Sequence, residues 1–201
     1  MAVSKANKGS STIGLQLFTI APIIEDTLEG TTYGDLLQID GIVEATITPE
    51  NTEADVQYAD DVEYDVVNPD PELTIVTTLA AVPLDVQKEI LGHKMDSNGV
   101  LVKSATDTPK YFAVGFRAEK ADHTFRYMWL LKMRAQPLTE NLRTKEGETI
   151  TRQTGEISWT AIKRTSDQQY QYVADEGLNG FTKQKAETFL QSVYTPVLPN
   201  T

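Results

Sequence analysis

The stretch YFAVGFRAEKADHTFRYMWLLKMR, residues 111–134, decides the fold class of this chain. Two arms rich in aromatic and branched residues flank the short polar segment AEKADH, and this arrangement predicts two antiparallel strands joined by a turn. Aromatic side chains on alternating strands are far more often part of a core than a ligand platform. We therefore expect Trp129 of this hairpin, and Trp159 of a later strand, to be buried.

Strand patterns continue on both sides of the hairpin. Five runs predict strands from their alternation or their β-branched content: residues 12–20, 36–47, 73–81, 148–164 and 169–174. In the first run, Ile13, Leu15 and Leu17 are expected to share one face. Gly41 interrupts the second run, which predicts a bulge or a bend there.

Two segments predict short helices. In PLDVQKEILG, residues 83–92, proline stands near the first turn and glycine just past the end, with apolar residues at helical spacing at Leu84, Ile90 and Leu91. Residues 182–193 have a similar apolar side.

About eight or nine strands, with helices that do not alternate with them, indicate a mainly β fold with minor α. We predict an antiparallel β-sandwich or barrel with one or two flanking helices and a long early loop between strands. No internal repeat or domain linker divides the chain, so residues 1–201 are expected to form a single domain.

Charge is distributed unevenly along the chain, whose net charge is −11. Residues 9–87 contain 16 acidic residues and no basic one, whereas residues 88–201 contain 16 basic and 13 acidic residues. This balance argues against free binding to nucleic acid or to an anionic membrane, since both favour a basic face. Two interpretations stay open: an acidic surface that keeps the protein soluble, or a polarised protomer whose acidic half faces a less acidic surface of another copy.

The most acidic segment is ITPENTEADVQYADDVEYDVVNPDPE, residues 47–72, with nine carboxylates and neither lysine nor arginine. We predict a long loop over residues 48–70, because connections of such length are uncommon unless they are functional or disordered. Tyrosines and valines spaced through the segment argue against permanent disorder. We expect the loop to become ordered only on assembly, since few of its residues can be buried in a lone protomer.

Residue types that usually carry catalysis are scarce. The chain has no cysteine, which excludes thiolate chemistry, and we expect His93 and His123 to be solvated side chains in turns. The segment DSNG, residues 96–99, resembles part of a calcium loop but lacks the further ligands, so it predicts a hairpin turn. Asp60 and Asp61 are more plausible as carboxylates of a charged loop than as an acid–base pair. The sequence thus predicts no enzyme, metal, cofactor or membrane insertion.

Several segments occur in an order that resembles a known family. They are TYGDLLQIDGIVEATITPE, YADD, PLDVQKEILGHKMDSNGVL, the hairpin quoted above, LRTKEGETITRQTGEISWTAIKR and FLQSVY, and they span about residues 12–194. In this combination the chain resembles the major tail protein, or tail tube protein, family of bacteriophages with long non-contractile tails, particularly siphophages of Gram-positive hosts. A piece such as YADD is weak alone, whereas the helix block followed by the aromatic hairpin is specific.

The resemblance implies a structural virion protein with two antiparallel sheets and a flanking helix, made in the cytoplasm of the bacterial host. Six copies would form a ring, and rings would stack head-to-tail into a tail tube that conducts DNA into the host. The implied partners are further copies of the chain, the tape-measure protein, tail terminator and tip proteins, and double-stranded DNA that passes through the lumen without specific binding. The N-terminal arm at residues 1–11, the loop at residues 48–70 and the C-terminal tail at residues 195–201 would make contacts between copies.

Two sets of residues are predicted at the contacts and at the lumen. Contact candidates are residues of the acidic loop and three bases that would meet them: Tyr58, Asp60, Asp61, Glu63, Tyr64, Val66, Arg143, Lys145 and Arg152. Carboxylates that face the lumen would repel DNA phosphate, and the candidates are Asp35, Asp40 and Glu44, for which an outer solvated face is an equal alternative. The alternative function is a β-sandwich module that binds carbohydrate or a cell surface through exposed aromatic residues.

Overall fold

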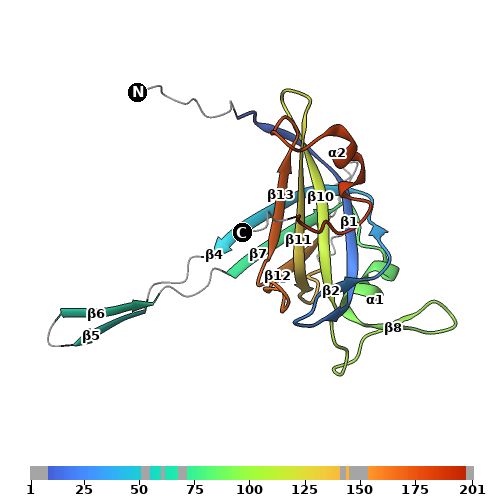
Figure 1. Ribbon diagram of the computed structural model, residues 1–201. Coiled ribbons are helices and arrows are strands. Elements are labelled where there is room, and N and C mark those ends of the chain that lie inside the picture. The colour runs from blue at the N-terminus through green and yellow to red at the C-terminus, as the bar shows by residue number, and fades with distance from the viewer. Residues whose placement is uncertain are drawn as a thin grey trace, which may run out of the picture.

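The predicted hairpin lies at the centre of the computed structural model, which describes residues 9–50, 55–59, 62–67, 72–140, 144 and 154–197. Strand β10 (Tyr111–Lys120) pairs antiparallel with β11 (Phe125–Ala135), and both stand in the middle of Figure 1. Most side chains of these two strands are buried or half-buried. The sequence therefore predicted the central element of the fold correctly.

One nine-stranded sheet is built around this hairpin in the order β2-β1-β10-β11-β12-β7-β4, with β3 beside β1 and β13 beside β11. The other strands are β1 (Thr12–Asp26), β2 (Thr31–Tyr33), β3 (Leu37–Gln38), β4 (Ile42–Glu50), β7 (Glu72–Leu79), β12 (Gly155–Ala161) and β13 (Gln171–Asp175). The strands pair antiparallel, which confirms the prediction of a mainly β, antiparallel fold with minor α.

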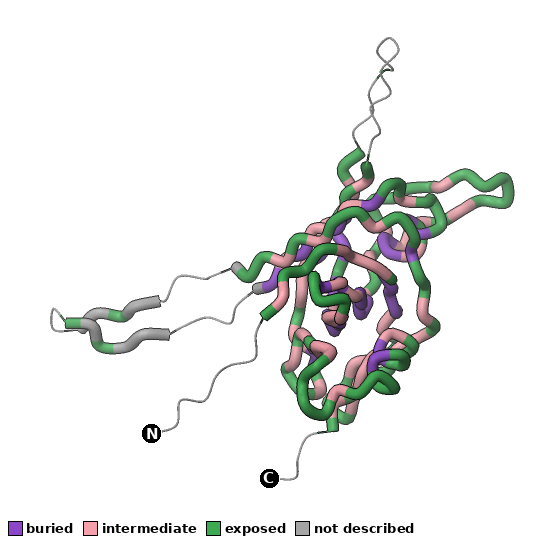
Figure 2. The backbone as a smooth tube through the Cα atoms, turned by 90° about the horizontal axis from the view of Figure 1, so that it is seen from above, coloured by how far each residue is buried: buried purple, intermediate pink, exposed green. Residues whose placement is uncertain are grey.

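The sheet divides along β11, because the two halves of this strand have different neighbours. Residues 126–130 pair with β13, whereas residues 133–135 pair with β12. Figure 2 shows the curved sheet surrounding the buried residues. The sheet does not close into a barrel, and the two sheets implied by the resemblance are one divided sheet.

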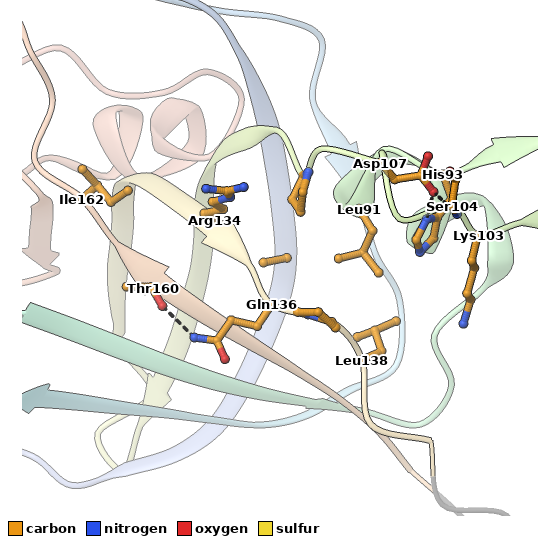
Figure 3. A pocket seen from close by; sticks show the side chains of 13 residues that line it. Leu91, His93, Lys103, Ser104, Asp107, Arg134, Gln136, Leu138, Thr160 and Ile162 are labelled. Carbon is orange, nitrogen blue, oxygen red and sulfur yellow. Dashed lines mark hydrogen bonds and ion pairs between the residues drawn. The ribbon is translucent and has the colours of Figure 1, made fainter.

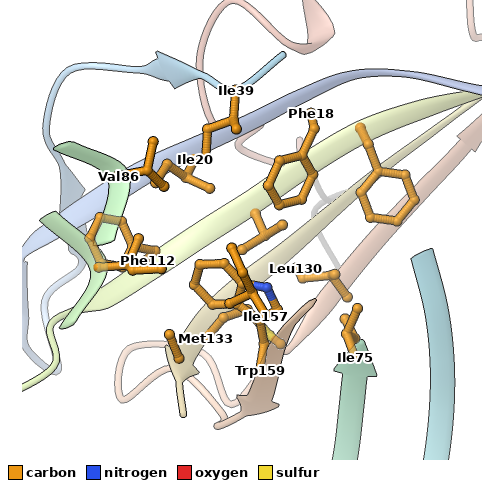
Figure 4. Close-up of a cluster of buried hydrophobic side chains, with 14 of the residues drawn as sticks. Phe18, Ile20, Ile39, Ile75, Val86, Phe112, Leu130, Met133, Ile157 and Trp159 are labelled. Atoms are coloured by element: carbon orange, nitrogen blue, oxygen red, sulfur yellow. The ribbon is translucent and has the colours of Figure 1, made fainter. Parts of the chain in front are cut away.

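The larger core lies inside this curve. Side chains of β1, β7, β10, β11 and β12 meet there with helix α1 (Leu84–Leu91), as Figure 4 shows for Phe18, Phe112 and Trp159. Trp159 is fully buried, and its indole Nε1 donates a hydrogen bond to Thr77 Oγ1 at 3.0 Å. Phe112 packs edge to face on Trp159 with 6.4 Å between the ring centroids, an arrangement that aromatic pairs favour.

Helix α1 follows the predicted pattern at both ends. It begins after Pro83 and ends at Gly92, whose φ of 73° is the left-handed conformation that glycine adopts most easily. Ile90 and Leu91 are buried, whereas Leu84 is 49% exposed. Val86, four residues before Ile90, occupies the inward row of the helix in place of Leu84.

The opposite face of the hairpin carries a second, smaller core. Helix α2 (Lys183–Phe189) is shorter than predicted; Thr182 Oγ1 caps it by accepting from Lys185 N, and the helix packs Ala186 and Phe189 on this face. Trp129 is fully buried, and its Nε1 donates to Phe189 O at 2.7 Å. Both tryptophans are thus core residues, so neither offers the exposed aromatic surface on which the alternative binding function mainly depended.

Strand β1 departs from the predicted alternation. A register irregularity over residues 16–19 contains Leu17, which has a left-handed φ of 56°. Past this bulge the inward positions change, so Phe18 is fully buried while Leu17 is exposed. Ile13, which lies at a second register irregularity between Thr12 and Gly14, is also exposed. The predicted shared face was therefore wrong, and of its three residues only Leu15 packs against the core.

The predicted strand at residues 36–47 divides at Gly41, where φ is 84°. The part before the glycine includes β3, which pairs with β1, and the part after it forms β4, which pairs with β7. The predicted bend is confirmed. The predicted strand at residues 148–164 is described from residue 154 and contains β12, whose Ile157 and Trp159 are fully buried.

Two short ribbons complete the fold. In the acidic segment, β5 (Asp55–Ala59) and β6 (Val62–Val67) pair with each other as a two-stranded sheet, and Figures 1 and 2 show it standing apart from the large sheet. The predicted loop thus contains paired strands, and its residues 48–50 extend β4. The second ribbon, β8 (Lys94–Met95) with β9 (Leu101–Val102), encloses the predicted Asn98-Gly99 turn.

Candidate assembly surfaces

The large sheet has open edges at which a further strand can pair. Among the described residues, β4 and β13 each have one strand neighbour, and residues 12–16 of β1 pair with β10 alone. Such edges present unpaired backbone N–H and C=O groups, which soluble monomers usually protect with charged side chains. Here the edges carry exposed apolar side chains: Ile13 is 61%, Val43 58% and Val173 54% exposed. Edges of this kind favour association with another chain.

The β5–β6 ribbon, called the acidic ribbon below, is a second candidate surface. Val62 and Tyr64 are two positions apart on β6, so they share one face, and they are 61% and 75% exposed. A lone two-stranded ribbon is at best marginally stable in water, because it has no sheet or helix against which to bury a face. A surface that covers Val62 and Tyr64 would supply the missing burial.

The structure places part of the predicted contact set on this ribbon. Tyr58 lies on β5, opposite Glu63 of β6, and Tyr64 and Val66 follow on β6. The other predicted residues lie outside the described part of the chain: Asp60, Asp61, Arg143, Lys145 and Arg152. The pairing of loop carboxylates with these three bases stays a prediction.

The predicted lumen carboxylates are all exposed, on neighbouring segments. Asp35 lies between β2 and β3, Asp40 lies between β3 and β4, and Glu44 lies on β4. Gln38 Nε2 donates to Asp40 Oδ1 at 3.1 Å, and none of the three carboxylates forms an ion pair with another described residue. They are accessible to solvent, and their orientation toward a lumen stays a prediction.

A hollow of about 740 Å³ lies between the end of α1, the segment after β9 and the ends of β11 and β12 (Figure 3). Its lining includes the apolar residues Leu91, Pro109, Ala135, Pro137, Leu138 and Ile162. Two bases belong to the same lining. Lys103 Nζ lies 3.4 Å from Glu140 Oε1 in an exposed pair, and the exposed Arg134 lies 5.8 Å from the ring centre of Tyr111, with no carboxylate partner among the described residues.

Charge distinguishes this hollow, called the basic hollow below, from two others on the described surface. Asp35 belongs to the lining of both other hollows, which have volumes of about 430 and 700 Å³. The lining of the larger one also contains Asp85 and Glu89, and Lys88 is its one base. In the basic hollow, Lys103 and Arg134 outnumber the single carboxylate. It is therefore the more favourable of the three for an acidic partner.

The carboxylate in this lining, Asp107, is already engaged. It accepts hydrogen bonds from Ser104 N and from His93 Nδ1, both at 2.7 Å, and these bonds lower the pKa of Asp107. The prediction of a solvated histidine was wrong for His93, which packs against this turn with its side chain 12% exposed. It is confirmed for His123, at 85% exposure.

Two partly buried polar clusters fix the loop between β12 and β13 to the β1–β2 side of the sheet. Asp26 accepts hydrogen bonds from Lys132 Nζ at 2.6 Å and from Thr165 N and Oγ1. Burial opposes the charge, but the hydrogen bonds outweigh it and hold the pKa of Asp26 well below its usual range. The second cluster joins the Arg164 guanidinium to Asp167, Tyr33 and Tyr172.

Sequence reasoning missed both these clusters and the basic hollow. Lys132 and Asp26 are 106 positions apart, and the hollow is formed by four separate segments of the chain. No spacing within a single segment signals either arrangement, because the sheet topology alone brings the partners together.

Other site types find no support in the described part of the chain. No three His, Cys, Asp or Glu side chains gather where an ion could be held, and no helix is both long and apolar enough to cross a membrane. The DSNG segment forms the predicted hairpin turn, in which Asp96 Oδ1 accepts from Asn98 N and Val100 N, both at 2.8 Å.

A sequence model of one protein family, described as phage tail tube protein, matches residues 25–195 of the chain. The match spans both helices, the acidic ribbon, the central hairpin and the basic hollow. No curated protein matches the sequence.

Proposed function

The chain belongs to the phage tail tube protein family, and from this premise we propose that its copies assemble into stacked rings that form the tube of a phage tail. The rings contain six copies and stack head-to-tail, and the phage is of the siphophage type with a Gram-positive host. The tube conducts DNA into the host cell during ejection. The protein is structural and needs no catalytic group or cofactor for this role.

The open sheet edges with exposed apolar side chains are the observation that carries the proposal. When one edge of a protomer pairs with a different edge of its neighbour, the contact is heterologous and closes into a ring if the rotation permits. Closure pairs the edges that would otherwise promote aggregation. β13, with the exposed Val173, and the first half of β1, with the exposed Ile13, lie on either side of the β10–β11 hairpin and are suited to this exchange.

The partners follow from the same role. Within the tail, the tube encloses the tape-measure protein during assembly and meets the terminator and tip proteins at its ends. Double-stranded DNA passes through without specific binding, and a chain with a net charge of −11 is suited to this because carboxylates repel phosphate.

Negative-stain electron microscopy of the concentrated protein, in low and high salt, tests the proposal. The wild type is expected to form rings or tubes of one diameter. Val173→Lys, which puts a charge on the β13 edge, is expected to stay folded but fail to assemble. Val100→Lys is the matched control, because Val100 is 55% exposed but lies outside the large sheet. A wild type that stays monomeric at high concentration, even with the tape-measure protein supplied, would contradict the proposal.

A further inference from the structure

The tight turn between β1 and β2, residues 27–30, presents an exposed leucine among acidic side chains. Leu28 is 82% exposed. Glu25 and Glu29 are also exposed, and neither forms an ion pair with another described residue. The turn has a fixed shape, because Thr27 donates hydrogen bonds from its backbone N and from Oγ1 to Gly30 O, at 3.0 and 3.3 Å. Single exposed leucines are common on protein surfaces, so a role for this one requires a surface that fits it.

The basic hollow offers such a surface. Its lining is apolar at Leu91 and Leu138, and Figure 3 shows Lys103 and Arg134 on either side of these two leucines. Arg134 has no carboxylate partner among the described residues, and its planar guanidinium can hold a carboxylate by two hydrogen bonds. Lys103 is held only by an exposed pair with Glu140, and such pairs exchange partners at little cost. An apolar centre flanked by charges complements a leucine flanked by charges of opposite sign.

The turn and the hollow lie at the same end of the large sheet but beside different strands. β1 ends at Asp26, whose carboxylate accepts a hydrogen bond from Lys132 near the end of β11. The lining of the hollow includes Arg134 of β11 and Thr160 of β12. In the strand order β2-β1-β10-β11-β12, the turn joins the first two strands and the hollow adjoins the last two. The described lining contains no residue of the turn, so the two surfaces are free to meet between copies that stand side by side in the same orientation.

We propose that the β1–β2 turn of one copy inserts Leu28 into the basic hollow of the neighbouring copy in the same ring. Glu25 and Glu29 then lie toward Lys103 and Arg134 of that neighbour. This inference rests on the proposed function and adds a lateral contact to the pairing of sheet edges. The two docking surfaces are different, so the contact is heterologous, and its repetition around the ring uses every turn and every hollow once.

Cysteine cross-linking tests the proximity directly, because the natural chain contains no cysteine. The variant Leu28→Cys with Ile162→Cys in one chain places a thiol on the turn and a thiol in the hollow, both at exposed positions. Mild oxidation of assembled tubes is expected to give a ladder of linked copies that ends at the copy number of one ring, whereas dilute protomers stay unlinked. Leu178→Cys with Ile162→Cys is the matched control and is expected to give no ladder, since Leu178 is 48% exposed but lies outside the turn.

Truncation of the leucine tests whether its burial drives the contact. Leu28→Ser is expected to raise the concentration needed for half-assembly by at least about tenfold, because the contact loses its apolar centre. The thermal unfolding midpoint of the dilute protomer is expected to stay unchanged, because Leu28 is 82% exposed there. Leu178→Ser makes the same replacement at another exposed leucine and is expected to alter neither value.

A charge exchange tests the polar part of the contact. Lys103→Glu with Arg134→Glu, or Glu25→Lys with Glu29→Lys, is expected to raise the concentration needed for half-assembly by about three- to tenfold. Combining the two double variants restores opposite charges and is expected to recover the wild-type value.

The possible outcomes separate this docking from the proposed function. Wild-type tubes with no ladder, together with normal assembly of Leu28→Ser, would overturn the docking and leave the proposed function standing. A ladder that continues beyond the copy number of one ring would place the contact between rings and would overturn the lateral docking. A wild type that never assembles would overturn both proposals.

Discussion

Two hairpins in the described part of the chain have opposite surroundings: the long central β10–β11 pair and the short acidic β5–β6 ribbon. The central hairpin has a sheet neighbour on each side, a large core on one face and helix α2 on the other. The ribbon has no further strand neighbour among the described residues, and two of its apolar side chains are exposed. The same strand–turn–strand pattern therefore serves two purposes. The central hairpin is part of the core of the protomer, whereas in the proposed tube the ribbon would obtain its burial from another copy.

Removing a central aromatic side chain is expected to have the largest effect. Trp129→Ala leaves a cavity beneath α2 and deletes the hydrogen bond to Phe189 O, so it is expected to lower the free energy of unfolding by about 3–5 kcal/mol. Urea unfolding monitored by circular dichroism measures this change. A loss below about 1 kcal/mol would show that the central hairpin is not what stabilises the protomer.

A smaller loss is expected from crowding the same site. Gly115 lies opposite Trp129, and a Cβ at this position would lie 2.7 Å from the indole ring. Gly115→Ala is therefore expected to cost about 1–3 kcal/mol of stability. Gly30→Ala is the control, since a Cβ at Gly30 would meet no atom within 4 Å, and its thermal unfolding midpoint should equal or slightly exceed that of the wild type.

The Asp26 cluster connects the central sheet to the loop before β13 and gives a pH-dependent effect. Asp26→Asn is expected to lower stability by about 2 kcal/mol at pH 7, because hydrogen bonds from Lys132 and Thr165 lose their charged acceptor. The folded pKa of Asp26 is depressed, so its contribution is present above the unfolded pKa of about 3.9 and is lost as pH falls below that value. Chemical denaturation at pH 7 and pH 3 measures this, and a variant deficit that does not shrink at pH 3 would contradict the assignment.

The ribbon is expected to show the smallest effect on the free protomer. Tyr64 is 75% exposed, so Tyr64→Ala should change the free energy of unfolding by less than about 0.5 kcal/mol. Urea unfolding of dilute, unassembled protein is the measurement. A large loss would mean that Tyr64 is buried within its own protomer, and the contrast between the two hairpins would disappear.

The sequence predicted well whatever depends on local pattern. The hairpin at residues 111–134, helix α1 with its closing glycine, and the break at Gly41 all follow from alternation, capping and backbone preference. The sequence-based prediction failed in β1, where a single residue changes the strand register. The left-handed backbone of Leu17 places Phe18 in the core instead of Leu17. The paired strands of the ribbon were also missed, because their carboxylates weaken the strand signal.

The sequence likewise revealed one of the two candidate assembly surfaces and missed the other. Tyr64 and the acidic segment around it became contact candidates through the family resemblance, and composition had already marked the segment by its many like charges with apolar residues between them. Lys103 and Arg134 gave no signal, since Arg134 reads as the end of a core strand and Lys103 as an isolated surface charge. Their meeting in one hollow depends on the path of the sheet, which a single sequence does not reveal.

Amide hydrogen exchange, measured on free protomers and on assembled tubes, tests the contrast between the two hairpins most directly. We predict slow exchange throughout β10–β11 in both states, and exchange in β5–β6 that is fast in the protomer and slow in the tube. Equal protection of β5–β6 in the two states would contradict the account, because the ribbon would then owe none of its order to a neighbouring copy.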